Sequence, residues 1–173
     1  MRKIRYVRQR DSSSCAPTMI MNVMKWAGLR ASWKGDLKRL RDRCHTMKFG
    51  INGSRWHFYI STLMEELFTR GIDFHFSDIV DPSVRQITRA IRSGAGVVLH
   101  IPHRDGSGHV MFIPSESKCK KKFLIVNGYY EYGDSVTAMV DKDVLRRQFR
   151  NCRRFDVPRL ATVYIKKDTK QKS

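Results

Sequence analysis

Cys15 sits where a cysteine could be activated as a nucleophile. It follows a serine run at 12–14, which is a natural N-cap region, and a helical pattern of apolar residues begins there. The start of a helix offers unpaired N–H groups and the positive end of the helix dipole, and both favour a thiolate over a thiol. The position predicts a nucleophilic thiolate; a small buried core residue is the alternative for a lone cysteine.

Gln9 lies six residues before Cys15, which lets its side-chain amide point back at the sulfur across a loop. An amide N–H beside the backbone N–H of Cys15 would form an oxyanion hole with two donors. Such a hole stabilises the negative oxygen that forms when a thiolate attacks an amide carbonyl. A solvated loop glutamine is the alternative.

Two residues farther along the chain can complete a catalytic set. His109 opens a predicted strand after the turn at 104–108, and Asn127 ends the next predicted strand. Adjacent antiparallel strands could hold the two side by side, so that His109 takes the proton of Cys15 while Asn127 orients the imidazole. Taken singly, a loop histidine and an Asn-Gly turn are the alternatives.

The elements that must position these residues come in an α+β order, helices first and an antiparallel sheet second. Periodic apolar residues and stop signals predict helices at 15–27, 34–43, 54–71, 82–94 and 141–149. In the helix at 54–71, we expect Phe58, Leu63 and Leu67 on the apolar face. Apolar runs predict strands at 72–76, 97–101, 109–113, 123–126 and 161–165. We expect one domain over 1–165 and a basic polar tail over 166–173.

Several stretches, in this order along the chain, resemble a known family. They are Gln9 to Pro17 with the helix that ends near Gly28, then Gly96 to Ile101, Gly108 to Phe112, Phe123 to Asn127 and Asp141 to Phe149. Together they cover about residues 6–150. They resemble the C39-type peptidases, papain-like cysteine proteases known as the leader-cleaving domains of bacteriocin exporters.

The resemblance implies a papain-like fold with N-terminal helices packed on an antiparallel β-sheet. It also implies a role for each of four residues: nucleophile for Cys15, base and acid for His109, orientation of the imidazole for Asn127 and oxyanion stabilisation for Gln9. The sequence departs from the family, which usually has Asp-Cys-Gly around the nucleophile and aspartate at the position of Asn127. The sequence shows no transporter segment, so we expect no role in export.

The chain is strongly basic, with 34 Lys and Arg against 16 Asp and Glu and a formal net charge of +18. The positive charges gather in clusters at 2–10, 38–43, 118–122 and 146–154, and Tyr6, Trp33 and Phe155 lie in or near them. Such a surface can follow phosphates and stack bases, so nucleic acid is a candidate partner and an acidic protein is another. A solvated face is the alternative for any one cluster.

The composition excludes several classes of protein. No run approaches the roughly 20 apolar residues of a membrane span, and four cysteines without a CxxC pair do not make a disulfide scaffold. His100, His103, His109 and Cys119 lack the spacing of a structural zinc site, and no phosphate-binding glycine loop occurs. We expect no metal, no cofactor and a cytoplasmic location; a short basic chain suits a phage or mobile-element protein.

These residues predict a cysteine peptidase or related thiol hydrolase that cleaves a peptide or isopeptide bond through a thioester acyl-enzyme. Two alternatives stay open. An acyltransferase of the same fold would pass the acyl group to an amine instead of water, a choice that depends on access rather than on the catalytic residues. A basic papain-fold protein could instead bind nucleic acid or an acidic protein partner without catalysis.

Overall fold

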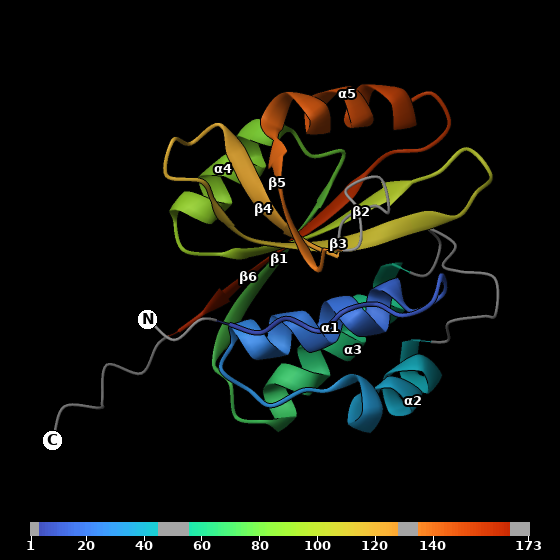
Figure 1. The fold of residues 1–173 in the computed structure, drawn as a ribbon, viewed down its shortest axis with the longest axis vertical. Helices are drawn as coiled ribbons and strands as arrows, with labels where there is room; N and C mark the ends of the chain where they lie inside the picture. Colours follow the sequence, from blue (N-terminus) through green and yellow to red (C-terminus); the bar gives the residue numbers. More distant parts are fainter. Residues whose placement is uncertain (1–3, 45–55, 128–134, 167–173) are drawn as a thin grey trace, which may run out of the picture.

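The computed structural model describes residues 4–44, 56–127 and 135–166 of the 173-residue chain. The helices are α1 (Cys15–Trp26), α2 (Trp33–Cys44), α3 (Trp56–Thr69), α4 (Val84–Arg92) and α5 (Lys142–Cys152). The strands are β1 (Phe74–Val80), β2 (Gly96–Pro102), β3 (Gly108–Glu116), β4 (Lys122–Val126), β5 (Thr137–Asp141) and β6 (Arg159–Ile165). They form a six-stranded antiparallel sheet in the order β1-β6-β2-β3-β4-β5 (Figure 1).

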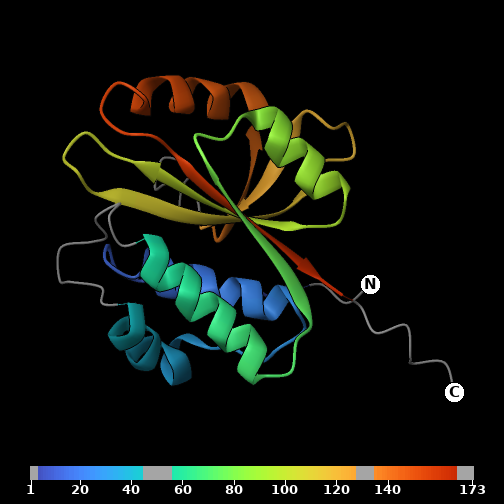
Figure 2. The ribbon, with the colours of Figure 1, turned by 180° about the vertical axis from the view of Figure 1, so that it is seen from behind.

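Helices cover both faces of this sheet. The helices α1, α2 and α3 share a core with one face, while α4 and α5 lie over the other, as Figure 2 shows from behind. This arrangement confirms the predicted α+β class, with N-terminal helices packed on an antiparallel sheet. Strand β2 lies between the two layers and is buried along its whole length, which explains its continuous apolar run. No described helix has the length and apolarity to cross a membrane.

Helix α1 ends where the sequence predicts. Gly28 follows it with φ +87°, a conformation that suits glycine. Its N–H donates to the carbonyl of Lys25 (3.1 Å), and the N–H of Leu29 donates to the carbonyl of Met24 (2.9 Å). This pair of bonds is a Schellman motif, which satisfies the last carbonyls of the helix and turns the chain away. The helix that carries Cys15 therefore has a defined end.

Two features of the fold differ from the expectations. Phe58 is 50% exposed, so its placement on the apolar face of α3 is wrong. Leu63 and Leu67 are fully buried as predicted, and Trp56 and Tyr59, rather than Phe58, continue the buried stripe at spacings of three and four residues. Strand β5 was not predicted, because its few residues show no clear alternation. Of the predicted tail at 166–173, all but Lys166 lies outside the described residues.

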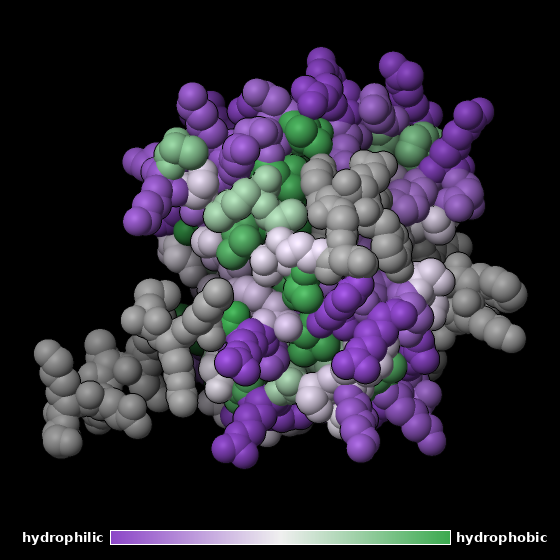
Figure 3. Space-filling model, in the orientation of Figure 1, coloured by the Kyte–Doolittle hydropathy of each residue, from purple (hydrophilic) through white to green (hydrophobic). Residues whose placement is uncertain are grey.

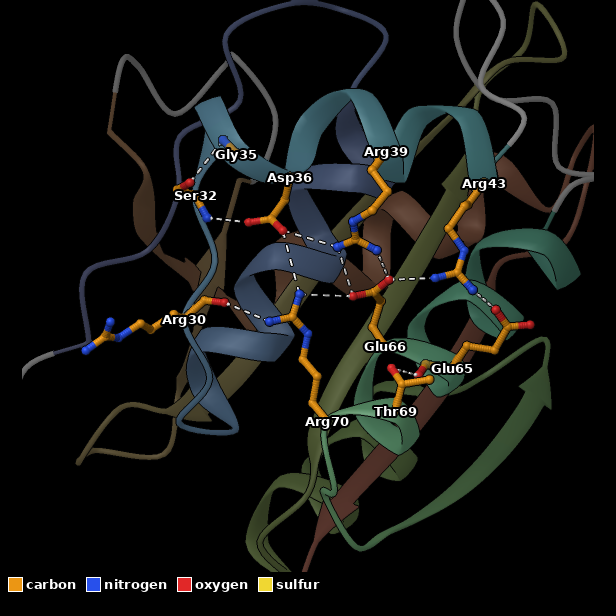
Figure 4. A network of polar contacts seen from close by, with 10 residues as sticks. All are labelled: Arg30, Ser32, Gly35, Asp36, Arg39, Arg43, Glu65, Glu66, Thr69 and Arg70. Atoms are coloured by element: carbon orange, nitrogen blue, oxygen red, sulfur yellow. Dashed lines mark hydrogen bonds and ion pairs between the residues drawn. The ribbon is translucent and has the colours of Figure 1, made fainter.

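A buried carboxylate joins α2 to α3 (Figure 4). Glu66 is only 2% exposed and accepts hydrogen bonds from Arg39 (Nη2 to Oε2, 3.0 Å), Arg43 (2.7 Å) and Arg70 (3.4 Å). Burial would raise the pKa of Glu66, but the hydrogen bonds from Arg39 and the charges of the three arginines lower it below its usual value. Much of the positive charge of the basic cluster at 38–43 is therefore paired with carboxylates that join the two helices.

We expect Glu66→Gln to lower the free energy of unfolding by about 3 kcal/mol at pH 7, because it leaves three guanidinium groups without their shared carboxylate. Since the folded-state pKa is lowered, this contribution is complete above the unfolded-state pKa near 4.5 and is lost as pH falls through the folded-state pKa. Urea denaturation at a series of pH values measures it. Glu65→Gln is the matched control, because Glu65 is 58% exposed and, among the described residues, its carboxylate pairs only with Arg43; its expected cost is about 0.5 kcal/mol. Equal losses from both variants contradict the prediction.

Candidate active site

Cys15 is the first residue of α1, and its side chain is almost fully buried (2% exposed). Ser14 occupies the N-cap position, and its carbonyl accepts hydrogen bonds from the N–H (3.0 Å) and the hydroxyl (2.6 Å) of Thr18. Its hydroxyl does not cap the helix but donates to the carboxylate of Asp11 (3.0 Å). The serine run thus marks the helix start as predicted, although the serine side chain serves the preceding loop.

The carboxylate of Asp11 organises that loop. It accepts from the N–H of Ser13 (2.9 Å), from the hydroxyls of Ser13 and Ser14 (3.0 Å each) and from Nη2 of Arg41 on α2 (2.6 Å). Arg41 also donates from Nε to the Ser14 hydroxyl (2.9 Å). The sequence reasoning missed both residues, although an aspartate before a serine run is a common signal for such a turn. Together they fix the backbone that leads into Cys15.

Burial raises the pKa of Cys15 from its ordinary value of 9.0 to about 11, and the charge of Asp11 adds to this rise. Hydrogen bonding from the backbone N–H of Val110, and from those of Ala16 and Cys15 itself, acts in the opposite direction but does not overcome burial. The free protein therefore holds Cys15 as a thiol near neutral pH. The helix N-terminus alone predicts a thiolate, and the structure reverses that expectation because the sulfur has little access to water.

Val110 of strand β3 packs in the same core as Cys15, and His109 precedes it in that strand. Nε2 of His109 lies 2.6 Å from the backbone carbonyl oxygen of Asn127, just beyond the end of β4. A carbonyl can only accept, so Nε2 carries the proton and Nδ1 is the basic nitrogen of the ring. Burial lowers the pKa of His109, and the bond to Asn127 offsets part of this shift. The imidazole is therefore neutral, in the form that a general base needs.

Asn127 holds the imidazole through its backbone and the N-terminal segment through its side chain. Its Nδ2 donates to the carbonyl of Val7 (2.9 Å), and its Oδ1 accepts from the N–H of Gln9 (3.2 Å). The sequence predicted the amide, not the carbonyl, as the group that orients His109. The reason for the difference is local: Asn127 has φ +51°, a left-handed conformation that asparagine tolerates.

The backbone of Val7 forms hydrogen bonds with two asparagine side chains. Its N–H donates to Oδ1 of Asn22 on α1 (2.6 Å), and its carbonyl accepts from Nδ2 of Asn22 (3.1 Å) as well as from Asn127. The N-terminal segment is thereby tied both to the helix that carries Cys15 and to the strand end that holds His109. Gln9, two residues later, is half-buried beside Asn127. Its Nε2 donates to the carbonyl of Asp11 (2.5 Å) and has a second hydrogen that it can offer to an oxyanion.

Hydrogen bonds link three of the four predicted residues, and the fourth, Cys15, lies at the start of α1, which packs on strand β3. His109 bonds the backbone carbonyl of Asn127, and the Asn127 amide bonds the backbone N–H of Gln9. These contacts join residues up to 118 positions apart in sequence. The arrangement has the components of acyl transfer, namely a thiol, a neutral imidazole with a fixed tautomer, and N–H donors beside the sulfur.

His100 is a buried residue near this site to which the sequence reasoning gave no catalytic role. It is 1% exposed, and within the described part of the chain neither ring nitrogen has a hydrogen-bond partner. It pairs with Val110 across β2 and β3, and its ring lies 6.1 Å from that of Trp56. Burial lowers the pKa of His100 to about 4. A Cβ at Gly108 would lie 2.1 Å from its Nε2, so this glycine gives the ring its space.

Across residues 4–44, 56–127 and 135–166, no group of three His, Cys, Asp or Glu side chains is placed to hold a metal ion. Two of the histidines considered as zinc ligands have other hydrogen-bond partners. His103 bonds Ser107 within a turn (3.2 Å), whereas His109 bonds Asn127. Cys119 is exposed in the turn between β3 and β4.

Comparison with known proteins rests on structure. No family model and no curated protein sequence matches the chain. The peptidase domain of Streptococcus ComA, a bi-functional ABC transporter involved in a quorum sensing pathway, has a similar structure, with a TM-score of 0.59 at 13% identity. The alignment covers 94% of this chain and 98% of that domain. The chain has a papain-like cysteine peptidase fold. The peptidase domain of Streptococcus mutans ComA (TM-score 0.48, 11% identity) and Pseudomonas avirulence protein AvrPphB (0.44, 9%) are also similar; these alignments cover 94% and 86% of this chain, and 98% and 90% of theirs.

Within this papain-like fold, we expect Asn127→Asp to destabilise the protein by about 1–3 kcal/mol at pH 7, because a carboxylate would face the carbonyl of Val7 with no hydrogen to donate. The repulsion raises the pKa of the new carboxyl group, so stability should recover as pH falls and the group becomes protonated. Thermal unfolding between pH 4 and 7 measures this. Asn151→Asp, at an exposed position on α5, is the matched control. An Asn127→Asp variant as stable as the parent at pH 7 contradicts the assignment of the amide.

Proposed function

We propose that this protein is a cysteine peptidase that cleaves a peptide or isopeptide bond through a thioester acyl-enzyme. The observation that supports this most is a histidine with a fixed tautomer: Nε2 of His109, on the strand that packs against the helix of Cys15, lies 2.6 Å from the carbonyl oxygen of Asn127. The fold it shares with peptidase domains agrees with the proposal.

In the first half of the proposed reaction, Nδ1 of His109 removes the thiol proton as the sulfur of Cys15 attacks the carbonyl carbon of the substrate. The carbonyl oxygen becomes an oxyanion, which the backbone N–H of Cys15 and Nε2 of Gln9 stabilise. The tetrahedral intermediate collapses and breaks the C–N bond, and the protonated imidazole gives its proton to the departing amine. The acyl group remains on the sulfur as a thioester.

In the second half, water attacks the thioester carbonyl while His109 again accepts a proton. The C–S bond breaks, the proton returns to the sulfur, and the carboxylic acid product leaves. The raised pKa of Cys15 and the lowered pKa of His109 mean that the resting pair is a neutral thiol and a neutral imidazole. Proton transfer then accompanies the attack, because the buried site disfavours a separate ion pair before substrate binds.

The proposal is tested by incubating the protein with a peptide library derived from a digested proteome. New peptide N-termini and C-termini are identified by mass spectrometry, with the Cys15→Ser protein as the matched control. We expect cleavages that depend on Cys15, and a rapid quench should recover protein that carries an acyl mass on Cys15. Incorporation of ¹⁸O from labelled water into the new C-termini separates hydrolysis from transfer to an amine. Equal product patterns from parent and variant would refute the proposal.

A further inference from the structure

A hollow of about 620 Å³ lies between α4 and α5, on the face of the sheet opposite α1. Asp143 is the only acidic residue among its lining side chains. Five arginines dominate the lining: Arg85, Arg146, Arg147, Arg150 and Arg153. All five arginines are exposed. Such a concentration of like charge around a concave surface attracts anions strongly.

The arginines form a continuous stripe because α5 presents them at helical spacing. Arg146, Arg150 and Arg153 are four and three residues apart, which places them on one side of the helix. Their positions extend over about 10 Å of helix axis. Arg85 reaches the same hollow from α4. The charges therefore line both walls of the hollow.

Three of these guanidinium groups have no ion-pair partner among the described residues: Arg85, Arg147 and Arg150. Arg146 pairs with Asp143, and Arg153 pairs with Asp81 (2.5 Å). The contrast is with the cluster at 38–43, whose arginines bind Asp11, Asp36, Glu65 and Glu66. Of these two basic clusters, the one on α5 keeps charge available for a ligand.

The basic surface continues past the N-terminal end of α5. The N–H of Lys142 donates to the carbonyl of Lys121 (3.1 Å), which fixes the turn between β3 and β4 beside the helix start. Lys118, Lys120 and Lys121 are exposed on this turn. In Figure 3, hydrophilic side chains crowd the upper edge of the molecule over α5.

We infer that the hollow between α4 and α5 binds the phosphate backbone of a nucleic acid. Guanidinium groups match phosphate oxygens with two parallel hydrogen bonds, and a row of them can follow successive phosphates. An acidic protein partner fits less well, because protein interfaces centre on apolar or aromatic anchors. The apolar lining residues, Val84 and Phe149, are 4% and 2% exposed and belong to the core.

Fluorescence anisotropy tests this with a fluorescein-labelled DNA duplex of about 20 base pairs, a single-stranded RNA of equal length and a labelled polyglutamate peptide. We expect the nucleic acids to bind, with affinity falling steeply as salt rises from about 50 to 200 mM. The triple variant R85Q/R147Q/R150Q should weaken binding at least about tenfold and reduce the slope of log affinity against log salt by about 2–3. Comparison of the DNA duplex with the single-stranded RNA shows which kind of nucleic acid the hollow prefers.

The matched control is R30Q/K34Q/K38Q, which removes the same charge from exposed side chains without ion pairs around α2, on the other face of the sheet. We expect it to change the affinity much less than the α4–α5 variant. Equal losses from both triple variants overturn the assignment of the hollow, as does an absence of nucleic-acid binding at 50 mM salt. Polyglutamate binding as tight as DNA binding, with the same dependence on the arginines, replaces nucleic acid with an acidic protein as the ligand. None of these measurements requires Cys15.

Discussion

Cys15→Ser is expected to reduce peptide cleavage by at least about 10³-fold and to eliminate the acyl adduct, because a buried serine hydroxyl is a far poorer nucleophile than a thiol. Thermal unfolding should be close to that of the parent, since the change replaces sulfur by oxygen at one buried atom. Cleavage measured on the peptides identified from the library gives the loss. Cys119→Ser is the matched control and should retain activity, because Cys119 is exposed in the turn between β3 and β4.

Thiol labelling tests the protonation state of Cys15, the proposed nucleophile, separately from turnover. Hydrogen bonding from Ser117 and neighbouring backbone groups lowers the pKa of Cys119, so iodoacetamide should modify this exposed thiol first. In a Cys119→Ser background, labelling of Cys15 should be slow at pH 7 and rise toward its pKa of about 11. Cys44, whose pKa burial raises to about 12, should lag behind Cys15. Fast labelling of Cys15 at pH 6 would mean that the free protein holds a thiolate.

His109→Ala should lower kcat by about 10²–10⁴-fold, the usual contribution of a positioned general base. In the parent protein, activity requires the neutral imidazole, so kcat/KM should fall as pH drops through the pKa of His109. Because burial lowers that pKa, the midpoint of this acid limb should lie below the ordinary value of 6.5. The pH profile of kcat/KM with a cleaved peptide gives the midpoint.

His103→Gln is the control for this experiment. His103 lies in the turn before β3, and its charge contributes to the lowered pKa of His109. The variant should keep kcat near the parent value and shift the acid limb slightly upward. An acid limb above pH 6.5 in the parent, or full activity of His109→Ala, contradicts the assigned role of the imidazole.

The elements that carry the site were predictable because their signals are local. Met19, Ile20 and Val23 repeat at helical spacing and are buried in α1, and Gly28 ends that helix. The buried run of β2 was also evident. These patterns arise from backbone geometry and burial, which act over a few neighbouring residues. Phe58 shows the limit of such predictions. An apolar residue can face water, and sequence spacing alone did not reveal which apolar residues of the helix would be buried.

The electrostatics of the site were not predictable in the same way. Sequence places Cys15 at a helix start, which lowers a thiol pKa, but its burial depends on strand β3 packing over it. The amide of Asn127 was expected on the imidazole, yet its bonds to Val7 and Gln9 need a segment 118–120 residues away. Long-range packing decides such contacts, and no local pattern encodes it. The burial of His100 without a hydrogen-bond partner among the described residues was not predicted for the same reason.

The hydrogen bonds of the Val7 backbone have a consequence for cleavage of the chain. One carbonyl oxygen there accepts from both Asn22, on the helix that carries Cys15, and Asn127, just beyond the strand end that contacts His109. The backbone of Val7 thus connects these two parts of the fold. Cleavage of the chain after Val7 should loosen both α1 and the end of β4 at once.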